Sequence, residues 1–335
     1  ATALLRLPRP ERLARLAELC LANADALLAA LRYCAAHRIG AFRINSQILP
    51  VKTHPQAGYD LRELPRAGQI MPRFRALKDG EVEEKSKGDY VTVADRRAEL
   101  WLTPRLEKLI AGSRVLGEEA VAADRSLLSL IDRDEPIWTV DPVDGTSNFI
   151  AGRETFYVMI ALVRGGVTES GWIYLPAAGD LATAERGGGA WWTSGDETVR
   201  LHAGLGPDDL RDIVGAFNTR FMPDEWRTRV EGLAGHVGRE ANDLCSAVDY
   251  TSVARGLKDI VTYHRMMPWD HVPGSLIVRE AGGVVRDMAS GIDYAPRTLA
   301  GPHLVARDEE TWMRVATADG FFELWSGVAG ATRGA

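Results

Sequence analysis

The order of predicted elements along the 335-residue chain indicates an α/β protein. Three apolar runs between about residues 156 and 192 are separated by Gly-containing turns, which is typical of an antiparallel meander. From about Leu201 onward, helical and strand patterns alternate. Hydrophobic residues make up 46% and charged residues 26% of the chain, so a sizeable core can form. We therefore expect an α+β part followed by an α/β part.

The first 65 residues are interpreted as a separate segment. Apolar residues recur at spacings of three and four from about Pro10 to His37, which predicts an amphipathic helix. A short strand over "GAFRINSQILP" and the turn-rich stretch "HPQAGYDLRELP" follow it. We place a boundary near Pro65 and expect residues 1–65 to form an N-terminal helix-strand extension.

Beyond this boundary we expect an α+β subdomain over residues 66–200 and an α/β subdomain over residues 201–330. The first begins with a helix over "RAGQIMPRFRAL", a charged turn over "KDGEVEEKSKGD" and a helix from about Ala94 to Ile110. Strands in "SRVLGEE" and "PIWTVDP" lead into the meander. In the second subdomain, helices are predicted near residues 223–234, 247–256, 270–281 and 309–318.

Charge and cysteine usage restrict the classes of partner. The net charge of −6 argues against nucleic acid or an anionic membrane as a partner, although residues 1–65 hold nine basic and five acidic residues. Cys20, Cys34 and Cys245 form no CxxC pattern, which indicates reduced thiols. No secretory leader is recognisable, and no apolar run reaches the roughly 18 residues of a membrane span. We expect a soluble, cytoplasmic protein.

Two aspartates lie three residues apart in "WTVDPVDGTSNFIAG", where an apolar strand meets a loop. Pro142 restrains the backbone between Asp141 and Asp144, so the two carboxylates lie close together. Two unneutralised carboxylates about 4 Å apart repel each other by several kcal/mol at an effective dielectric constant near 20. They therefore need a proton, a cation or separation by water.

Further carboxylates and a Gly-containing turn extend this candidate site. Glu118 and Glu119 end the strand in "VLGEEA", and they join the aspartates if that strand neighbours "PIWTV". Asp270, in "PWDHVPGSL", is a third source of carboxylate. Such a set of oxygens suits Mg²⁺. Gly145 and Thr146 open a helix whose N–H groups could bind phosphate, so the site could hydrolyse a phosphate ester.

Each of these features also has a purely structural interpretation. Asp-Gly is a common hairpin turn, and Asp270 and Asp95 could simply cap their helices. Glu118 and Glu119 could be solvated surface residues. The combination of all these carboxylates is less easily explained in that way.

Taken together, "DYVTVADRRAE", "VLGEEA", "WTVDPVDGTSNF" and "PWDHVPGSLIVREAGGVV" resemble the inositol monophosphatase family of Mg²⁺-dependent, often lithium-sensitive phosphomonoesterases. The resemblance covers roughly residues 66–320. It implies a layered α-β-α-β-α sandwich of the inositol monophosphatase and fructose-1,6-bisphosphatase type. Dimers are common in the family, which makes a homodimer the oligomer to test for.

The resemblance also implies roles for individual residues. Glu118, Asp141 and the carbonyl of Val143 would hold a first Mg²⁺ ion, and Asp141, Asp144 and Asp270 a second; a third, weaker ion would depend on Glu118. The backbone of Gly145 and Thr146 would bind phosphate. Catalysis would use Glu118 and Thr146 paired with Asp95, which helps to activate a metal-bound water for in-line attack on phosphorus. Lys85 matches a basic residue of the family's mobile metal-site loop, but "KSKG" is also an ordinary solvated turn.

The sequence departs from the family at the substrate end. Members that act on inositol phosphates usually carry an acidic residue about seven positions before the last metal-binding aspartate. This chain has "TYHRMMPWD" there, with Tyr263, His264 and Arg265. An arginine near the pocket would suit a second anionic group, as in a bisphosphate, although an arginine is more often just a surface residue. His264 and Arg265 are therefore candidate substrate residues.

The segment "LANADALLAALRYCAAHRIGAFRINSQILPVKTHP" resembles the beginning of UV damage endonucleases, which are metal-dependent DNA repair enzymes with a TIM barrel fold. A barrel needs eight strands, and the stretches with that family's His and Glu ligands are absent from this sequence. A fusion would explain why the phosphatase-like part starts late. The leading hypothesis is a phosphomonoesterase acting on a small phosphorylated alcohol; a repair-type endonuclease and a non-catalytic interaction protein are the alternatives.

Overall fold

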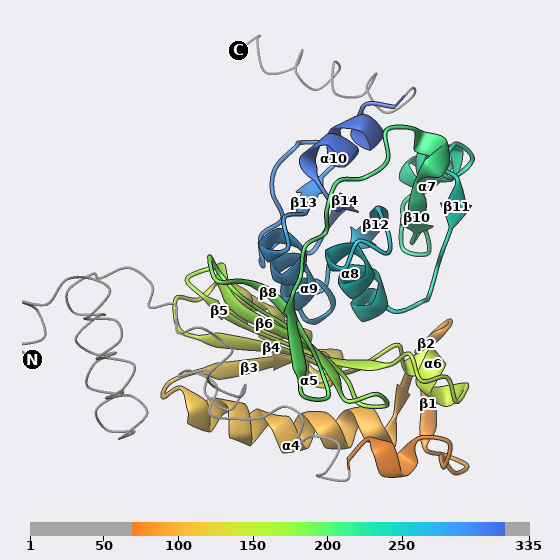
Figure 1. Ribbon diagram of the computed structural model, residues 1–335. Coiled ribbons are helices and arrows are strands. Elements are labelled where there is room, and N and C mark those ends of the chain that lie inside the picture. Colours follow the sequence, from red (N-terminus) through yellow and green to blue (C-terminus); the bar gives the residue numbers. More distant parts are fainter. Residues whose placement is uncertain (1–68, 319–335) are drawn as a thin grey trace, which may run out of the picture. The chain divides into compact units, whose positions relative to one another are not determined.

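Two large β-sheets, a two-stranded hairpin and the helices around them make up residues 69–318, the part of the chain that the computed structural model describes (Figure 1). The helix and strand predicted within residues 1–65 lie outside these described residues. None of the described helices combines the length and the apolarity that crossing a bilayer requires.

The first sheet has seven strands, which follow one another in chain order. The first two strands are parallel and all other neighbours are antiparallel, which confirms the predicted meander. Apolar runs form its central strands because both faces of the sheet are covered. The strands are β3 (Arg114–Gly117), β4 (Ile137–Asp144), β5 (Tyr157–Arg164), β6 (Val167–Leu175), β7 (Asp180–Glu185), β8 (Gly189–Ser194) and β9 (Glu197–Arg200).

The second sheet has five strands in the order β11-β10-β12-β14-β13. β10 is parallel to both of its neighbours, and β14 is antiparallel to both of its own. A connecting stretch, residues 201–213, separates the two sheets along the chain, and we retain a subdomain boundary near residue 200 as a proposal. The strands are β10 (Val214–Phe217), β11 (Arg239–Glu240), β12 (Ile260–Arg265), β13 (Val284–Asp287) and β14 (Ala300–Ala306).

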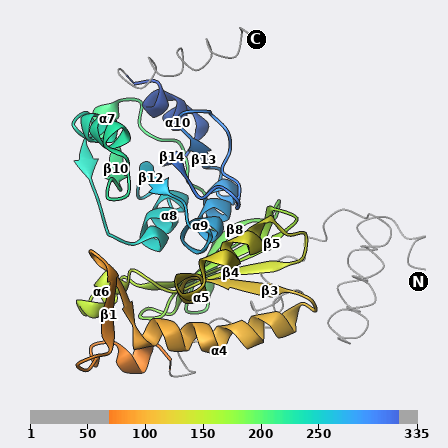
Figure 2. The ribbon, with the colours of Figure 1, turned by 180° about the vertical axis from the view of Figure 1, so that it is seen from behind.

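The helices form three layers, one on each side of the pair of large sheets and one between them, which confirms the predicted α-β-α-β-α sandwich (Figures 1 and 2). α4 (Val93–Leu109) packs on β3 and β4, on the outer face of the seven-stranded sheet. α8 (Ser246–Ala254) and α9 (Pro268–Glu280) lie between the sheets, and α9 contacts both of them. α7 (Asp224–Ala234) and α10 (Glu309–Ala316) cover the far face of the five-stranded sheet.

The main core lies between the sheets and depends on close approach of α8 and α9. A Cβ on Gly274 of α9 would lie 2.2 Å from Cγ of Tyr250 on α8, so only glycine permits this crossing. A second cluster of buried apolar residues joins the five-stranded sheet to α7 and α10. Together these clusters fix the position of the N-terminus of α9, which carries Asp270.

Two sequence predictions before α4 are wrong. The described part of "RAGQIMPRFRAL" contains only a short 3-10 helix, η2 (Met71–Arg73), because Pro72 cannot continue a helix from its N-terminal side and Arg75 adopts a positive φ of 58°. Phe74 instead packs its ring 4.9 Å from that of Phe156. The charged turn is a hairpin of β1 (Val82–Ser86) and β2 (Asp89–Thr92), turning at Gly88.

Candidate active site

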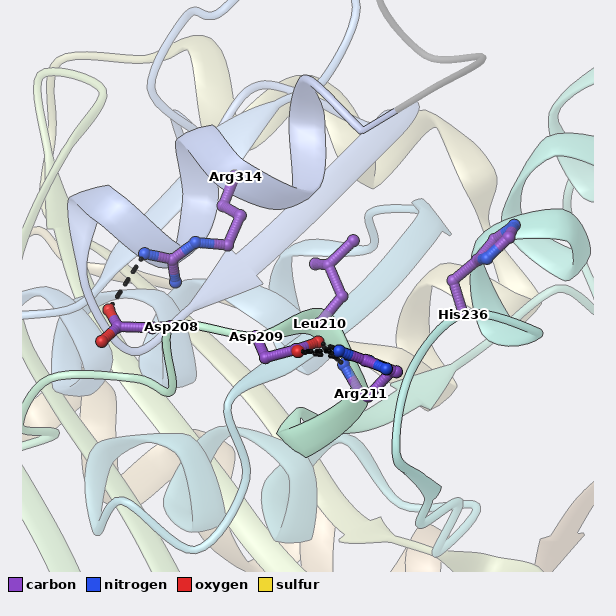
Figure 3. A pocket seen from close by; sticks show the side chains of 6 residues that line it. All are labelled: Asp208, Asp209, Leu210, Arg211, His236 and Arg314. Atoms are coloured by element: carbon purple, nitrogen blue, oxygen red, sulfur yellow. Dashed lines mark hydrogen bonds and ion pairs between the residues drawn. The ribbon is translucent and has the colours of Figure 1, made fainter.

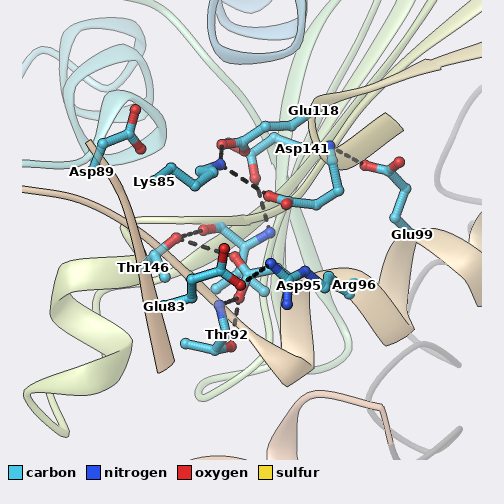
Figure 4. Close-up of polar contacts among 12 residues, drawn as sticks. Glu83, Lys85, Asp89, Thr92, Asp95, Arg96, Glu99, Glu118, Asp141 and Thr146 are labelled. Atoms are coloured by element: carbon cyan, nitrogen blue, oxygen red, sulfur yellow. Dashed lines mark hydrogen bonds and ion pairs between the residues drawn. The ribbon is translucent and has the colours of Figure 1, made fainter. Parts of the chain in front are cut away.

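The carboxyl ends of β3 and β4 bring two of the predicted acids to one edge of the seven-stranded sheet. Gly117 pairs with Val140 in the parallel register, so Glu118, the first residue of α5 (Glu118–Ala123), lies beside Asp141 (Figure 4). Asp270, in the first turn of α9, completes the group. Glu118, Asp141 and Asp270 each offer a carboxylate oxygen, and these atoms lie within 4.8 Å of one another. We call these three residues the acid cluster.

A β-bulge explains how Asp141 and Asp144 lie on one face of the strand. In a regular strand, residues three apart point to opposite faces. Here Asp141 pairs with Met159 and Asp144 with Tyr157, so three residue steps on β4 oppose two on β5. The extra residue turns Asp144 to the same face as Asp141.

The carboxylate of Asp144 nevertheless points to the N-terminus of α8. Its Oδ2 accepts hydrogen bonds from the backbone N–H of Ala247 at 2.6 Å, the thiol of Cys245 at 3.0 Å and the hydroxyl of Ser246 at 3.2 Å. Its Oδ1 has a single long contact, 3.4 Å from the backbone N of Ser246. Burial raises the pKa of Asp144, and the hydrogen bonds from Ala247 and Cys245 oppose that shift.

The acid cluster is partly buried, and its carboxylates repel one another. Asp141 is only 2% exposed, and its Oδ1 accepts a hydrogen bond from the backbone N–H of Val143 at 2.8 Å. Burial raises the pKa of Asp141 well above its usual range, and the charges of Glu118 and Asp144 raise it further. Burial has the same effect on the pKa of Asp270. A cation at this point would relieve the repulsion.

Lys85 of β1 supplies one positive charge to the cluster. Its ammonium lies 2.7 Å from Oε1 of Glu118 and 3.1 Å from Oε1 of Glu119 (Figure 4). Burial disfavours the charged form of Lys85, but the two carboxylates outweigh burial and raise its pKa. The hairpin thus places the predicted lysine on the acids, although one lysine cannot neutralise all of them.

Asp95 and Thr146 meet behind the cluster, as the resemblance implies. Asp95 lies in the first turn of α4, where it forms a capping box with Thr92. Oγ1 of Thr146 lies 3.1 Å from Oδ1 of Asp95 and 2.9 Å from the carbonyl oxygen of Val143 (Figure 4). Burial raises the pKa of Asp95 to about 7. The hydroxyl of Thr146 is therefore held between two acceptors at the edge of the site.

Gly145 makes the turn from β4 into α6 (Thr146–Ile150). It has a φ of +83°, a left-handed conformation that favours glycine. A Cβ at this position would lie 2.9 Å from the carbonyl oxygen of Thr155 and 3.2 Å from Sγ of Cys245. The predicted phosphate-binding pair, Gly145 and Thr146, is thus placed directly after the acid loop and next to α8.

Sequence reasoning missed Glu99. This buried side chain of α4 accepts hydrogen bonds from the backbone N–H of Glu119 and of Ala120, both at 2.8 Å, and so caps the helix that begins with Glu118. Burial raises the pKa of Glu99 to about 7. The available signal was its spacing: Glu99 follows Asp95 by four residues, which places both acids on one helix face.

Tyr263 and the two candidate substrate residues, His264 and Arg265, lie on β12 and face different surroundings. The hydroxyl of Tyr263 donates to buried Asp249 at 2.9 Å, and the ammonium of Lys258 lies 2.5 Å from the other oxygen of that aspartate. His264 is partly buried, which lowers its pKa, and the charge that acts on it comes from Asp287 of β13 rather than from the acid cluster. Arg265 is half-exposed and pairs with Asp89 of β2 at 3.7 Å. Of the three, only Arg265 reaches toward the hairpin and the site.

A pocket of about 560 Å³ opens elsewhere, beside η4 (Leu210–Asp212) (Figure 3). Arg211 pairs with Asp209, and Arg314 pairs with Asp208 at 3.5 Å, so both of its arginines already have carboxylate partners. It contains none of the predicted site residues. Its lining consists of Asp208, Asp209, Leu210, Arg211, His236 and Arg314.

Two family models match this chain. The model of the inositol monophosphatase family matches residues 60–319. The model of the UV-endonuclease UvdE matches residues 2–75. These matches confirm both resemblances stated from the sequence and show that the chain joins segments of two families.

Individual proteins agree with the first match. An inositol-1-monophosphatase of Mesorhizobium japonicum is 33% identical over 248 residues, which span 72% of this chain and 90% of that protein. The Nus factor SuhB of Escherichia coli is 31% identical over 246 residues, spanning 72% and 88%. The crystal structure of the extragenic suppressor protein suhB from Bartonella henselae has a TM-score of 0.62 and 29% identity, over 76% of this chain and 95% of that one.

Proposed function

Because this chain belongs to the inositol monophosphatase family of phosphoric monoester hydrolases, we propose that it is a Mg²⁺-dependent enzyme that hydrolyses a small phosphorylated alcohol. The acid cluster is the observation that supports this most directly. Three carboxylate oxygens lie within 4.8 Å of one another, one of them on an almost fully buried residue, and among residues 69–318 a single ammonium group, that of Lys85, pairs with them. This arrangement is unfavourable unless a cation joins it.

The donor set fits Mg²⁺, which prefers oxygen ligands and is commonly held by a few carboxylates together with substrate phosphate. Glu118, Asp141 and Asp270 would hold the metal. Asp144 would contribute through Oδ1, because its hydrogen bonds to α8 are concentrated on Oδ2. We also propose that the carbonyl oxygen of Val143 is a metal ligand and that the site holds two or three ions.

The surrounding residues would position substrate and water. Bound Mg²⁺ would supply Lewis-acid chemistry, withdrawing charge from the phosphate ester and making water more acidic. The backbone N–H groups of Gly145 and Thr146 would bind the phosphate oxygens. The hydroxyl of Thr146, which is 3.1 Å from Asp95, would accept the proton of the attacking water at Oγ1 and pass its own proton to Oδ1 of Asp95.

Phosphate release from a panel of small phosphate esters, with and without Mg²⁺, tests this function. In Asp141→Asn, loss of one charged ligand should lower Mg²⁺-dependent turnover by at least about a hundredfold, comparable to removing one group that stabilises transition-state charge. Asp134→Asn changes an exposed acid outside the site and serves as the matched control. Wild-type turnover by a folded Asp141→Asn protein would contradict the site assignment.

Two other functions can be separated in the same experiments. Similarity to the Nus factor SuhB supports an interaction protein without catalysis as the second candidate. A folded chain that binds Mg²⁺ but releases phosphate from no ester would favour that role. The UvdE match keeps a DNA repair role as an alternative, and cutting of irradiated DNA by the purified chain would support it.

A further inference from the structure

Three residues form a basic rim beside the acid cluster: Arg220 and Phe221, between β10 and α7, and Arg265 at the end of β12. We call them the arginine rim. Arg265 pairs with Asp89, which itself pairs across the hairpin with Ser86, the neighbour of Lys85. The backbone carbonyl oxygen of Arg265 also lies 2.8 Å from Nε2 of His271, the residue that follows Asp270 in α9. Arg265 is thus connected to both sides of the proposed catalytic site.

The guanidinium of Arg265 is largely available to a ligand. Its side chain is 39% exposed, and its ion pair with Asp89 is long, at 3.7 Å between Nη1 and Oδ2. No second carboxylate among the described residues lies within ion-pair distance. The central carbon of the guanidinium, Cζ, lies 4.0 Å from the centroid of the Phe221 ring. Stacking of this kind fixes the plane of a guanidinium and leaves its N–H edges free to bind an anion.

Arg220 also packs against Phe221. Its guanidinium lies 4.7 Å over the same ring and donates hydrogen bonds to the backbone carbonyls of Lys87 and Gly88 at the hairpin turn. Within residues 69–318 it pairs with no carboxylate. The arginine rim therefore carries two guanidinium groups against one carboxylate, that of Asp89, and presents Phe221 as a 43% exposed apolar face.

Tyr263 stands where family members that act on inositol phosphates usually carry an acidic residue, and it cannot bind a substrate hydroxyl in its place. Tyr263 is 7% exposed and its hydroxyl is already bonded to Asp249. Asp249 also accepts hydrogen bonds from Lys258 and Asn218, so its carboxylate is not available to a substrate. Of the two candidate substrate residues, His264 responds to Asp287 of β13, whereas Arg265 reaches the hairpin through Asp89.

We propose that Arg265 determines specificity by binding a second anionic group of the substrate, a carboxylate or a phosphate, while the phosphate ester occupies the acid cluster. This inference rests on the proposed phosphatase function. It predicts that the preferred esters carry a further negative charge, and that a neutral alkyl phosphate is a poor substrate.

Three two-carbon esters separate the possibilities: ethyl phosphate, phosphoglycolate, which adds a carboxylate, and ethane-1,2-diol bisphosphate, which adds a phosphate. For the wild type, we expect kcat/KM to be higher for one or both of the esters with the second anion. Arg265→Ala should lower that preference by about tenfold to a hundredfold, the effect of losing a hydrogen bond to a charged group. Arg265→Lys should restore only part of it, because lysine lacks the planar fork.

Two further variants distinguish substrate binding from a structural role. Asp89→Asn removes the ion-pair partner but leaves Arg265, so it should keep or increase the preference. Arg105→Ala removes another arginine, on α4, that is stacked 4.0 Å over an aromatic ring. This control should leave the ratios of kcat/KM among the three esters unchanged. If Arg265→Ala lowers turnover of all three esters equally, or Asp89→Asn reproduces its effect, the inference is wrong while the phosphatase function stands. If the wild type hydrolyses none of them with Mg²⁺, both are wrong.

Discussion

The contact between Gly117 and Glu99 offers a sharp test of how the acid cluster is positioned. A Cβ at Gly117 would lie 2.3 Å from Cδ of Glu99 and 2.5 and 2.6 Å from its oxygens, so Gly117→Ala forces the carboxylate to move. That movement breaks the hydrogen bonds from the backbone N–H of Glu119 and Ala120. The backbone itself accepts alanine, because Gly117 has a φ of −96°.

The magnitude follows from these contacts. Each hydrogen bond to a charged group contributes about 1.5 to 3 kcal/mol, so two lost bonds cost about 3 to 6 kcal/mol. Replacing glycine by alanine at a compatible backbone position returns about 0.4 to 1 kcal/mol by restricting the unfolded chain. We therefore expect Gly117→Ala to lower the free energy of unfolding by about 2 to 6 kcal/mol. It should also weaken the protection that Mg²⁺ gives against thermal unfolding, because Glu118 follows directly.

Urea denaturation at pH 8 measures the first effect, and thermal melts with and without Mg²⁺ measure the second. Gly232→Ala on α7 is the matched control, because a Cβ there meets nothing within 4 Å and alanine favours a helix by up to about 1 kcal/mol. The double variant with Glu99→Ala should be no less stable than Glu99→Ala alone, since the clash is gone. A Gly117→Ala protein as stable as the wild type would refute the reasoning. So would a double variant whose loss of unfolding free energy equals the sum of the losses in the two single variants.

Three further outcomes are expected. Lys85→Met should lower the melting temperature of the metal-free protein, because Glu118 loses its cation, and Mg²⁺ should then raise it by more than in the wild type; equal melting of both metal-free proteins would contradict this. Lys258→Met leaves Asp249 buried and unpaired, so urea denaturation should show a loss of about 3 to 5 kcal/mol, whereas adding Asp249→Asn should recover part of it. Burial raises the pKa of Glu99 from 4.5 to about 7, so the folded state binds its proton more tightly than the unfolded state does. The carboxyl therefore destabilises the fold increasingly as the pH rises from 4.5 to 7, by about 3 kcal/mol in total, and the wild type should lose that much relative to Glu99→Gln; a pH-independent difference would exclude the shift.

Much of the fold was predictable because its central elements are apolar and regular. The continuous apolar runs of β4 and β5 predicted buried strands, and the spacing in α4, α8, α9 and α10 predicted helices within a few residues of their observed ends. The hairpin of β1 and β2 was not predictable in this way. β1 is mostly exposed, so charged residues such as Glu83 and Lys85 replace the apolar alternation that identifies a strand.

The order of residues along the chain was enough to identify the carboxylates that could form a site. Glu118 and Asp141 each follow an apolar strand, and parallel pairing of those strands necessarily brings their ends to one edge of the sheet. Local chemistry therefore sufficed to predict the acid pair and the glycine turn that follows it. The family was identified from the resemblance of four motifs, which are spread between residues 89 and 285.

The orientation of these groups and the residues that balance their charge depend on the packing of distant segments. The direction of Asp144 depends on α8, about a hundred residues further along the chain, and the capping of α5 depends on Glu99 of another helix. The contact of Lys85 with Glu118 and the place of Arg265 beside Asp89 likewise join distant segments. Hydrogen bonds and ion pairs act over a few ångströms in space, whatever the separation along the chain, so sequence spacing carries no record of them until the sheets and helices have packed.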